Sequence, residues 1–507
     1  MSQASTVSEL LAAGRDDAIA IGAPDREPLT YAGLRDHVKD TVAALNARGL
    51  GRNDRVAIVL PNGPEMATAF VAIACGATTA PLNPAYREEE FEFYLSDLNA
   101  KALVVEQGSD SPAVSAANKL GIPLLEIVPG RAAGLFGFAG EAGTGTATDN
   151  GGLAQGDDVA LVLHTSGTTS RPKIVPLTHR NLCASARNIR TTLALTPEDR
   201  CLNVMPLFHI HGLMAAILAS LSVGASVVCT PGFNALKFFG WLDAAKPTWY
   251  TAVPTMHQAI LARAPRSKEI VKAAKLRFIR SSSSSLPPQV MKALEETFGA
   301  PVIEAYAMTE ASHQMTSNPL PPRPRKPGTV GTAAGPEVAI MDEQGELLSA
   351  GSVGEIVIRG ENVTLGYENN PTANAENFTN GWFRTGDQGV MDEDGYVSIT
   401  GRLKEIINRG GEKISPREVD DVLMDHPAVQ QVVTFAIPHP KLGEEVAAAV
   451  VLREGQQATE HDIREFASAH LADFKVPRKV LFLEEIPKGA TGKLQRIGLA
   501  EKLGITG

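Results

Sequence analysis

Short apolar runs alternate with helical patterns from the N-terminus to about Gly401, and this alternation constrains the fold more than any other feature. The run Asp54–Pro61 ("DRVAIVLP") predicts a buried strand, and "PEMATAFVAIACGA" behind it predicts a helix. The runs "KALVVEQ", "DVALVLHTSG" and "PTWYTAVP" continue the pattern, whereas Ala132–Asp158 reads as an irregular surface connection. Strands that alternate with helices imply mostly parallel sheets covered by helices. The predicted fold class is therefore α/β.

The pattern changes after Gly401. Ser415, with Glu418 three residues later, predicts a helix that begins with a capping box. Two strand-like runs, a second capped helix and the run "KVLFLEEIP" follow. At 507 residues, the chain is too long for one ordinary core. We expect a large N-terminal domain of mixed, mostly parallel sheets with helices, residues 1–401, and a small α+β domain, residues 402–507.

Charge and cysteine usage exclude several function classes. The formal net charge is −10 and no Lys/Arg-rich block stands out, which argues against a nucleic-acid or anionic-membrane surface. The four cysteines are widely spaced without a CxxC pair, so we expect reduced thiols, not disulfides or a zinc site. The uncharged segment Gly212–Cys229 is interrupted by Gly and Ser, so we expect a buried helix and strand there instead of a membrane span.

The two ends of the sequence bear on localisation. The first residues lack the pattern of a signal peptide, and the final "GITG" is not a peroxisomal address of the Ser-Lys-Leu type. With no span expected, the sequence predicts a cytoplasmic protein. The oligomeric state is left open.

The stretch Leu163–His179 ("LHTSGTTSRPKIVPLTH") directly follows a predicted strand. Its hydroxyls, approachable backbone N–H groups and one lysine can wrap a polyphosphate. It is not a Walker A loop, because the GxxxxGK[ST] spacing is missing. The candidate phosphate-binding residues are Thr165, Ser166, Gly167, Thr168, Thr169 and Lys173.

This loop resembles the phosphate-binding signature of the acyl-adenylate-forming superfamily, which includes acyl-CoA synthetases, firefly luciferase and the adenylation domains of peptide synthetases. Further stretches match in the family's order: "PLFHIHG", "EAYAMTE", "GWFRTGD", "GRLKEIINRGGEKISPREVD" and "PKGATGKLQR". The resemblance spans essentially the whole chain. It implies an AMP-forming acid–thiol ligase that uses ATP, Mg²⁺, coenzyme A and a small carboxylic acid. The loop departs from the family at Ser170 and Ile174, where Gly is usual.

The resemblance also implies a role for each matching residue in the large domain. Glu310, next to Thr309, would hold Mg²⁺, since a hard cation needs oxygen ligands. The adenosine would lie against Glu304, Ala305 and Tyr306, with Asp387 and Arg402 on the ribose. His209 is the remaining catalytic candidate, near the mouth of the acid pocket.

In this family the small domain rotates between two half-reactions, so the resemblance implies a mobile C-terminal domain. Lys493, in "GATGKLQR", would neutralise charge as a carboxylate attacks the α-phosphate and pyrophosphate leaves. Lys404 falls at the hinge position, and Gly410 and Gly411 would border the tunnel for the pantetheine arm of CoA.

The serine run in "RFIRSSSSSLPPQV" follows a predicted strand and precedes a helical pattern. By resemblance it borders the acid pocket, where Ser281–Ser285 offer hydroxyls suited to a second carboxylate. The combined motifs look very like those of plant and fungal oxalate–CoA ligases, Ser170 included. Ser283 and His313 would then contact the distal carboxylate, with His211 near the pocket mouth and His313 one helical turn beyond Glu310.

Three other functions stay open. The first is a short-chain or aromatic acyl-CoA synthetase of other specificity. The second is an adenylation module serving a protein-bound pantetheine, disfavoured because no carrier-like segment follows the last lysine motif. The third is a nucleotide-binding regulator without turnover, which would not need the lysine of the adenylation step.

Overall fold

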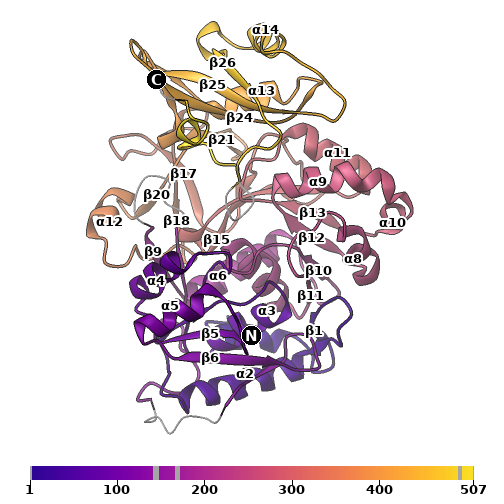
Figure 1. The fold of residues 1–507 in the computed structure, drawn as a ribbon, viewed down its shortest axis with the longest axis vertical. Helices are drawn as coiled ribbons and strands as arrows, with labels where there is room; N and C mark the ends of the chain where they lie inside the picture. The colour runs from indigo at the N-terminus through magenta and orange to yellow at the C-terminus, as the bar shows by residue number, and fades with distance from the viewer. Residues whose placement is uncertain (1–2, 141–147, 166–171, 489–493, 506–507) are drawn as a thin grey trace.

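Two mostly parallel sheets flanked by helices form the large N-terminal part of the protein, and a smaller C-terminal part lies against one end of it (Figure 1). The computed structural model describes residues 3–140, 148–165, 172–488 and 494–505. The predicted α/β fold, with a large N-terminal and a smaller C-terminal domain, is confirmed.

The first sheet has seven strands in the order β7-β6-β5-β3-β4-β8-β9. Its central strands pair in parallel, and the edge strands β7 and β9 are antiparallel. The strands are β3 (Arg55–Ile58), β4 (Thr78–Pro81), β5 (Ala102–Glu106), β6 (Leu124–Pro129), β7 (Phe136–Phe138), β8 (Val159–His164) and β9 (Ile174–Thr178). The helices that connect them are α3 (Pro64–Ala74), α4 (Glu88–Asp97) and α5 (Pro112–Leu120).

The second sheet has nine strands in the order β16-β15-β14-β13-β12-β10-β11-β1-β2. The strands are β1 (Ile19–Gly22), β2 (Leu29–Thr30), β10 (Arg200–Asn203), β11 (Ser226–Cys229), β12 (Trp249–Ala252), β13 (Phe278–Ser281), β14 (Val302–Met308), β15 (His313–Ser317) and β16 (Thr332–Ala333). The main helices of this part are α2 (Tyr31–Asn46), α6 (His179–Thr192), η2 (His211–Leu218), α8 (Phe238–Ala245), α9 (Pro254–Arg263), α10 (Lys268–Ala273) and α11 (Pro288–Phe298). Shorter helices are α1 (Val7–Leu10) and α7 (Ala219–Leu221).

The winding of the second sheet changes direction between β10 and β12. The chain leaves β10 for β11 on one side, and then returns past β10 to β12 on the other side. Connections that leave two neighbouring parallel strands in opposite directions open a crevice at their carboxyl ends, where open α/β sheets bind ligands. The topology therefore predicts a binding site near the ends of these two strands, at Asn203 and Ala252.

A third, antiparallel sheet continues the large part. Its strands are β17 (Glu337–Met341), β18 (Val353–Arg359), β19 (Phe378–Thr379), β20 (Trp382–Met391) and β21 (Val397–Arg402), with α12 (Pro371–Asn377) beside them. In the pairing of β20 with β21, Asp387 lies directly opposite Arg402. Two predicted ribose-binding residues are thus neighbours by strand register.

The C-terminal part is built on a fourth sheet, in the order β23-β22-β25-β24 with β26 on β25. Its strands are β22 (Ile407–Arg409), β23 (Glu412–Ile414), β24 (Val429–His439), β25 (Gly443–Leu452) and β26 (Lys479–Phe482), and its helices are α13 (Pro416–Leu423), α14 (Glu460–His470) and α15 (Leu499–Lys502). Of the two hydrogen bonds of the predicted capping box at α13, the first forms: Ser415 Oγ accepts from the backbone N–H of Glu418 at 3.4 Å. The Glu418 carboxylate instead accepts from Lys475 Nζ at 2.6 Å.

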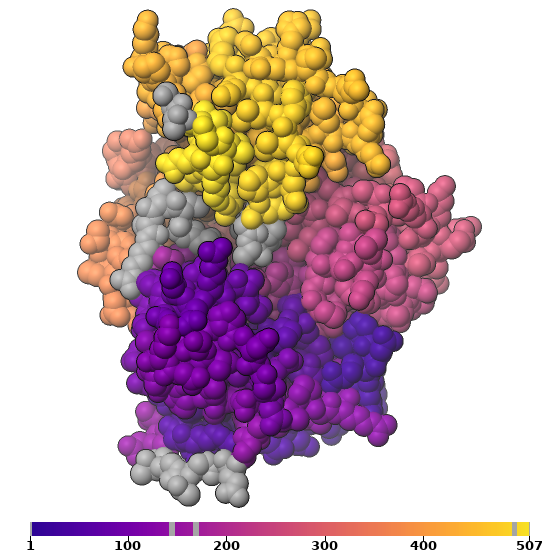
Figure 2. Space-filling model, in the orientation of Figure 1, coloured from indigo at the N-terminus to yellow at the C-terminus, as the bar shows by residue number. Residues whose placement is uncertain are grey.

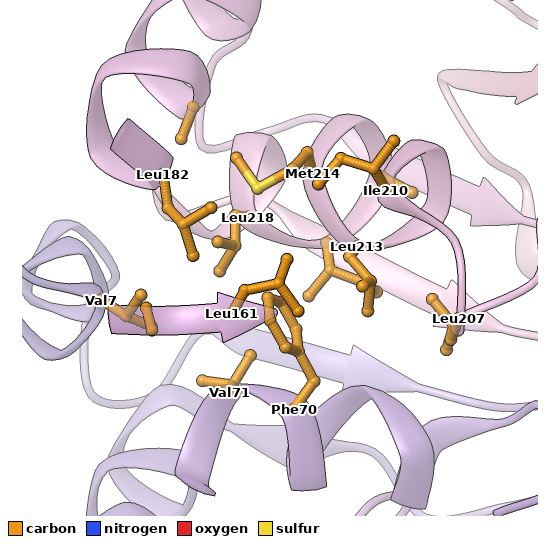
Figure 3. Packing of buried hydrophobic residues seen from close by; sticks show 14 of the residues in the cluster. Val7, Phe70, Val71, Leu161, Leu182, Leu207, Ile210, Leu213, Met214 and Leu218 are labelled. Atoms are coloured by element: carbon orange, nitrogen blue, oxygen red, sulfur yellow. The ribbon is translucent and has the colours of Figure 1, made fainter. Parts of the chain in front are cut away.

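The segment Gly212–Cys229 is a buried helix followed by a strand, as predicted. Figure 3 shows Leu213 and Leu218 of its helix η2 directed at Phe70 of α3 and Leu161 of β8. Among the helices that the structure describes, none has the length and apolar character needed to cross a membrane. All four cysteines are buried free thiols.

Two local expectations were wrong. Strand β7 lies within Ala132–Asp158, which reads as irregular because it has few branched residues. His313 begins strand β15 and does not follow Glu310 along a helix, since the short helix η4 (Thr309–Ala311) ends at Ser312, whose φ is +49°.

Candidate active site

A cavity of about 250 Å³ lies between the large and the small part. Figure 2 shows the small part, in yellow, seated on the rest of the molecule. The large part supplies the serine turn, the end of β14 and strands β20 and β21, and the small part closes the other side. The lining residues are Ser283, Ser284, Ser285, Ala305, Tyr306, Ala307, Met308, Val330, Asp387, Ile399, Gly401, Arg402, Glu405, Arg417, Leu494 and Arg496.

One end of the cavity holds a tyrosine, a carboxylate and a guanidinium in contact. Tyr306 Oη donates a short hydrogen bond to one oxygen of Asp387, and Arg402 Nε donates to the other at 3.0 Å. Asp387 raises the pKa of Arg402, and burial, followed by the Asp387 charge, raises the pKa of Tyr306. The three residues predicted for the nucleoside are thus brought together, with an aromatic face and a carboxylate side by side.

Glu310 lies at the start of the segment after β14, directly behind Thr309. Tyr367 Oη donates to Glu310 Oε1 at 2.7 Å, and Lys173 Nζ lies 4.5 Å from the centroid of the Tyr367 ring. Burial raises the pKa of the Glu310 carboxyl, and the Tyr367 hydrogen bond and the charges of Arg402 and Lys173 oppose that rise. No pattern in the sequence pointed to Tyr367.

The donor set around Glu310 fits Mg²⁺ better than a metal that needs a protein cage. Among the described residues no group of three His, Cys, Asp or Glu side chains could hold a metal ion. Mg²⁺ commonly takes one or two carboxylates and completes its shell with substrate phosphates and water. A single carboxylate beside Lys173 is consistent with that arrangement.

Glu304 supports the serine turn. Its Oε1 accepts from the backbone N–H of Leu286 at 2.8 Å, and the side chain is 1% exposed. Burial raises its pKa to about 7. Ser282 Oγ donates to the carbonyl of Ala305 at 2.9 Å, which fastens the turn to β14 from the other side. Of the predicted nucleotide contacts in "EAY", Ala305 and Tyr306 line the cavity and Glu304 lies beneath it.

The other end of the cavity is bordered by Ser283, a residue with φ of +74°. Its Oγ lies 2.9 Å from Nδ1 of His211. Nε2 of the same ring lies 2.6 Å from Thr251 Oγ1 and 3.5 Å from Arg280 Nη1. The His313 ring stacks on His211, with centroids 5.0 Å apart.

This polar cluster sits at the carboxyl ends of β10, β12 and β13, where the winding of the sheet reverses. Ser283 is half-buried, whereas His211 and His313 have no exposed surface. His209 is half-buried just before η2, and its Nδ1 accepts from the backbone N–H of His211 at 3.3 Å. Thr251 was not foreseen, although it ends a strand that the sequence did predict.

Arg280 lies behind this cluster and was also not foreseen. It is fully buried in β13, and its Nη2 donates to Gln314 Oε1 at 3.3 Å. Burial lowers its pKa to about 9. In the sequence Arg280 stands before five serines and marks the end of a predicted strand. That its side chain points inward became clear only from the register in which β13 pairs with β12.

Ile174, the unexplained departure in the phosphate loop, belongs to strand β9. Its side chain is 6% exposed and packs in an apolar cluster of the first sheet. At this end of the loop, Thr165 N–H donates to the carbonyl of Lys173 at 3.0 Å. The remaining loop candidates, Ser166, Gly167, Thr168 and Thr169, lie outside the described residues.

The predicted residues of the small part lie in three places. Lys404 is exposed in the short helix η5 (Leu403–Glu405), directly after Arg402. Gly410 and Gly411 form the turn of the β22–β23 hairpin with φ of +59° and +99°, a conformation that favours glycine. Lys493 lies outside the described residues, and Leu494, which follows it, lines the cavity.

Comparison with known proteins agrees with this arrangement. Residues 9–368 match the AMP-binding enzyme family, and residues 418–493 match the AMP-binding enzyme C-terminal domain. The chain is 48% identical to an oxalate–CoA ligase of Arabidopsis thaliana, over 95% of this chain and 94% of that protein. It is 45% identical to an oxalate–CoA ligase of Saccharomyces cerevisiae, over 89% and 87% of the two chains.

Among solved structures, ATP-bound MatB from Rhodopseudomonas palustris superposes with a TM-score of 0.88, at 30% sequence identity and with 98% of each chain covered. The likeness therefore includes both parts of the molecule. The chain belongs to the AMP-binding enzyme family, as an AMP-forming acyl-CoA ligase that acts on a carboxylic acid with ATP and CoA.

Proposed function

We propose that this ligase activates oxalate: oxalate and ATP give oxalyl-AMP and pyrophosphate, and the CoA thiol then displaces AMP to give oxalyl-CoA. Two relatives that share almost half of its residues carry that activity in their names. The observation that carries the proposal is the charge behind Ser283, where the buried guanidinium of Arg280 forms no ion pair with any carboxylate in the described ranges.

A buried cation without a counter-ion is costly, because water no longer solvates its charge. Burial already lowers the pKa of Arg280 to about 9. An acid that keeps a second negative charge in the pocket would compensate this cation, whereas the tail of a monocarboxylic acid brings no charge. Oxalate keeps one carboxylate free while the other reacts, so its charge complements Arg280.

Pocket size favours the same acid. The rings of His211 and His313 stack behind Ser283 and leave no exposed surface there. A hydrocarbon tail that continued past Ser283 would meet these two rings and the hydroxyl of Thr251. An acid without any hydrocarbon avoids both the clash and the burial of an apolar chain against polar groups.

For the first half-reaction we assign the nucleoside to Tyr306, Asp387 and Arg402, which are already in contact. Asp387 accepts from the ribose hydroxyls, and Glu310 provides the carboxylate for Mg²⁺, which supplies charge neutralisation on the phosphates. Lys493 is assigned to the developing charge on the α-phosphate. The carboxylate oxygen of oxalate attacks phosphorus, and pyrophosphate leaves with the electron pair of the broken P–O bond.

For the second half-reaction the small domain, residues 402–507, turns about Lys404 and brings Gly410 and Gly411 to the pantetheine arm. The thiol loses its proton, sulfur attacks the oxalyl carbonyl, and AMP leaves as its phosphate oxygen takes the bonding pair. Leu494 and Arg496 line the cavity, which supports the assignment of the C-terminal lysine motif to the first half-reaction.

A panel of carboxylic acids, scored by AMP formation with CoA present, tests the proposal. The panel contains oxalate, malonate, acetate, butyrate and a cinnamate, and each acid is also scored by exchange between pyrophosphate and ATP without CoA. We expect oxalate to give the highest kcat/KM in both assays. A preference for acetate, butyrate or the cinnamate would overturn the proposal and leave an acyl-CoA synthetase of other specificity.

A further inference from the structure

We propose that Arg280 and Thr251 are positioning residues that hold His211 in its neutral Nδ1–H form, so that Ser283 must point its own hydroxyl proton at the acid. The inference rests on the proposed function in one respect: the group that meets Ser283 is an anionic carboxylate. Each contact in the series from Arg280 through His211 to Ser283 then has a defined donor and acceptor.

The direction is set at Nε2 of His211. Arg280 Nη1 lies 3.5 Å from this nitrogen, and a guanidinium has only N–H donors. A proton on Nε2 would point at a buried cation, and repulsion at that distance is strong when water is excluded. Nε2 therefore stays unprotonated and accepts, and the hydroxyl of Thr251, 2.6 Å away, donates to it.

An unprotonated Nε2 determines the state of Nδ1, the other ring nitrogen of His211. A neutral imidazole that lacks a proton on Nε2 carries it on Nδ1, and Nδ1 lies 2.9 Å from Ser283 Oγ. Ser283 then accepts from His211, which leaves the hydroxyl proton of Ser283 free to be donated. Ser283 borders the cavity, so the carboxylate of a bound acid is the acceptor within its reach.

The opposite tautomer would reverse the effect. With the proton on Nε2, Ser283 would donate to Nδ1 and present only oxygen lone pairs to the cavity. Lone pairs that face a carboxylate repel it, so the same residues in the same places would reject the substrate. Arg280 thus acts on the acid through two intervening side chains and without touching it.

Arg280 is itself held in place. Gln314 accepts from Arg280 Nη2 at 3.3 Å, while the amide nitrogen of Gln314 donates to Thr192 Oγ1 at 3.1 Å and to the carbonyl of Ala334 at 3.2 Å. Because both amide protons are used, the oxygen of Gln314 must face the guanidinium. Stacking of His313, with 29° between the ring planes, fixes the plane of His211.

The decisive measurement is the tautomer of His211 in the full-length enzyme without ligands. Enzyme labelled with ¹⁵N-histidine is examined by long-range ¹H–¹⁵N correlation, and the His211 signals are assigned from their loss in His211→Asn. We expect one neutral species with the proton on Nδ1. An Nε2–H tautomer or an imidazolium near neutral pH would overturn the proposal, whichever acid the enzyme uses.

Kinetics provide the second readout. Arg280→Gln removes the charge, and we expect KM for oxalate to rise about 10- to 100-fold with a smaller change in kcat, since the lost interaction orients a bound carboxylate. Arg280→Lys keeps the charge and should recover part of the loss. A KM for Arg280→Gln equal to that of the wild type would contradict the inference.

Thr251→Val keeps the shape at Nε2 and removes only the hydroxyl, so it carries the test if Arg280→Gln does not fold. We expect KM for oxalate to rise several-fold and a second tautomer to appear, whereas Thr251→Ser keeps the hydroxyl and should behave as the wild type. An unchanged spectrum and KM in Thr251→Val would argue against the inference. If the Nδ1–H form is found but oxalate is no substrate, the proposed function fails and the tautomer assignment stands.

Discussion

Tyr306 and Asp387 are hydrogen-bonded in the wall of the cavity although 81 positions separate them in the chain. Tyr306 lies in β14 of the nine-stranded sheet, and Asp387 lies in β20 of the antiparallel sheet, where Arg402 donates to its second oxygen. The three residues that we assign to the nucleoside are thus in contact without a ligand. If the assignment is correct, a ribose would need little reorganisation of these side chains to bind.

The first prediction tests this pairing. Asp387→Asn keeps the shape but removes the charge that Arg402 contacts at 3.0 Å, and an amide nitrogen cannot accept from a ribose hydroxyl. We expect KM for ATP to rise about 10- to 100-fold, the effect of losing charge-assisted hydrogen bonds. Asp394→Asn is the matched control, because this side chain is 73% exposed and pairs with Lys326. Equal KM values for ATP in wild type and Asp387→Asn would remove Asp387 from the nucleotide site.

The second prediction concerns the metal ligand. Glu310→Gln keeps the contact with Tyr367 possible but gives up the anionic oxygen that a hard cation prefers. We expect the Mg²⁺ concentration at half-maximal activity to rise by about an order of magnitude, while the thermal unfolding midpoint changes little. Glu361→Gln, at a side chain that is 75% exposed, serves as the control. Activity at limiting Mg²⁺ that matches the wild type would place the ligand elsewhere.

The third prediction separates the half-reactions. Lys493→Ala should abolish adenylation and leave thioester formation from pre-made acyl-AMP largely intact, because the lysine is assigned to the first conformation only. Lys404→Pro should do the reverse, since proline fixes a backbone torsion that must change at a hinge. Each variant is assayed for pyrophosphate–ATP exchange and, separately, for CoA consumption with acyl-AMP. Equal losses in both assays would contradict a rotating domain.

The fourth prediction follows from Glu304. Its pKa is raised to about 7 by burial, from an ordinary value of 4.5. Between these two pH values the folded protein keeps a proton that the unfolded chain has lost, so the free energy of unfolding falls as the pH rises. Glu304→Gln still accepts from Leu286 N–H and should remove this decline, worth about 2–3 kcal/mol at most.

Urea unfolding of ligand-free enzyme at pH 5 and pH 8 measures the effect. The control is Glu296→Gln, whose side chain is 68% exposed and should leave the pH dependence as in the wild type. If wild type and Glu304→Gln lose the same stability between the two pH values, Glu304 is ionised in the folded protein. That result would contradict the raised pKa of Glu304 and leave its hydrogen bond with Leu286 N–H in place.

The sequence was most informative where one local pattern determines a structure. Buried strands such as β3 and β12 follow from short apolar runs, and the switch at Gly401 follows from a change of pattern. The contacts that build the site instead join residues that lie far apart in the sequence. Tyr367 meets Glu310, and Thr251 meets His211, only because sheets pack in a particular register, and no single stretch of sequence contains that information.

Arg280 shows most clearly why contacts in the site could not be predicted from the sequence. The strand that contains it was foreseen, yet whether a strand residue points inward depends on a one-residue register that the neighbouring strands decide. Of the serine run, Ser283, Ser284 and Ser285 line the cavity, and their contact with the acid stays a prediction. Its function as one end of a hydrogen-bond chain became visible only with His211 in place.

The last prediction concerns the acid itself. Oxalate offers no hydrocarbon, so the enzyme can select it only through groups that bind its distal carboxylate and through walls that exclude a longer chain. Ser283 supplies one hydrogen bond, and His313 supports the wall by stacking on His211. Because a hydrogen bond to a charged group contributes about 1.5–3 kcal/mol, Ser283→Ala should lower kcat/KM for oxalate roughly 10- to 100-fold, and His313→Ala, which removes the ring stacked on His211, somewhat less. Both variants should also discriminate less against acetate and butyrate, since the polar wall that rejected a tail is opened.

His461→Ala is the control, at a side chain that is 84% exposed in the small part. Wild-type kinetics with oxalate in His313→Ala would show that the stacked histidines fill the core and do not select the acid.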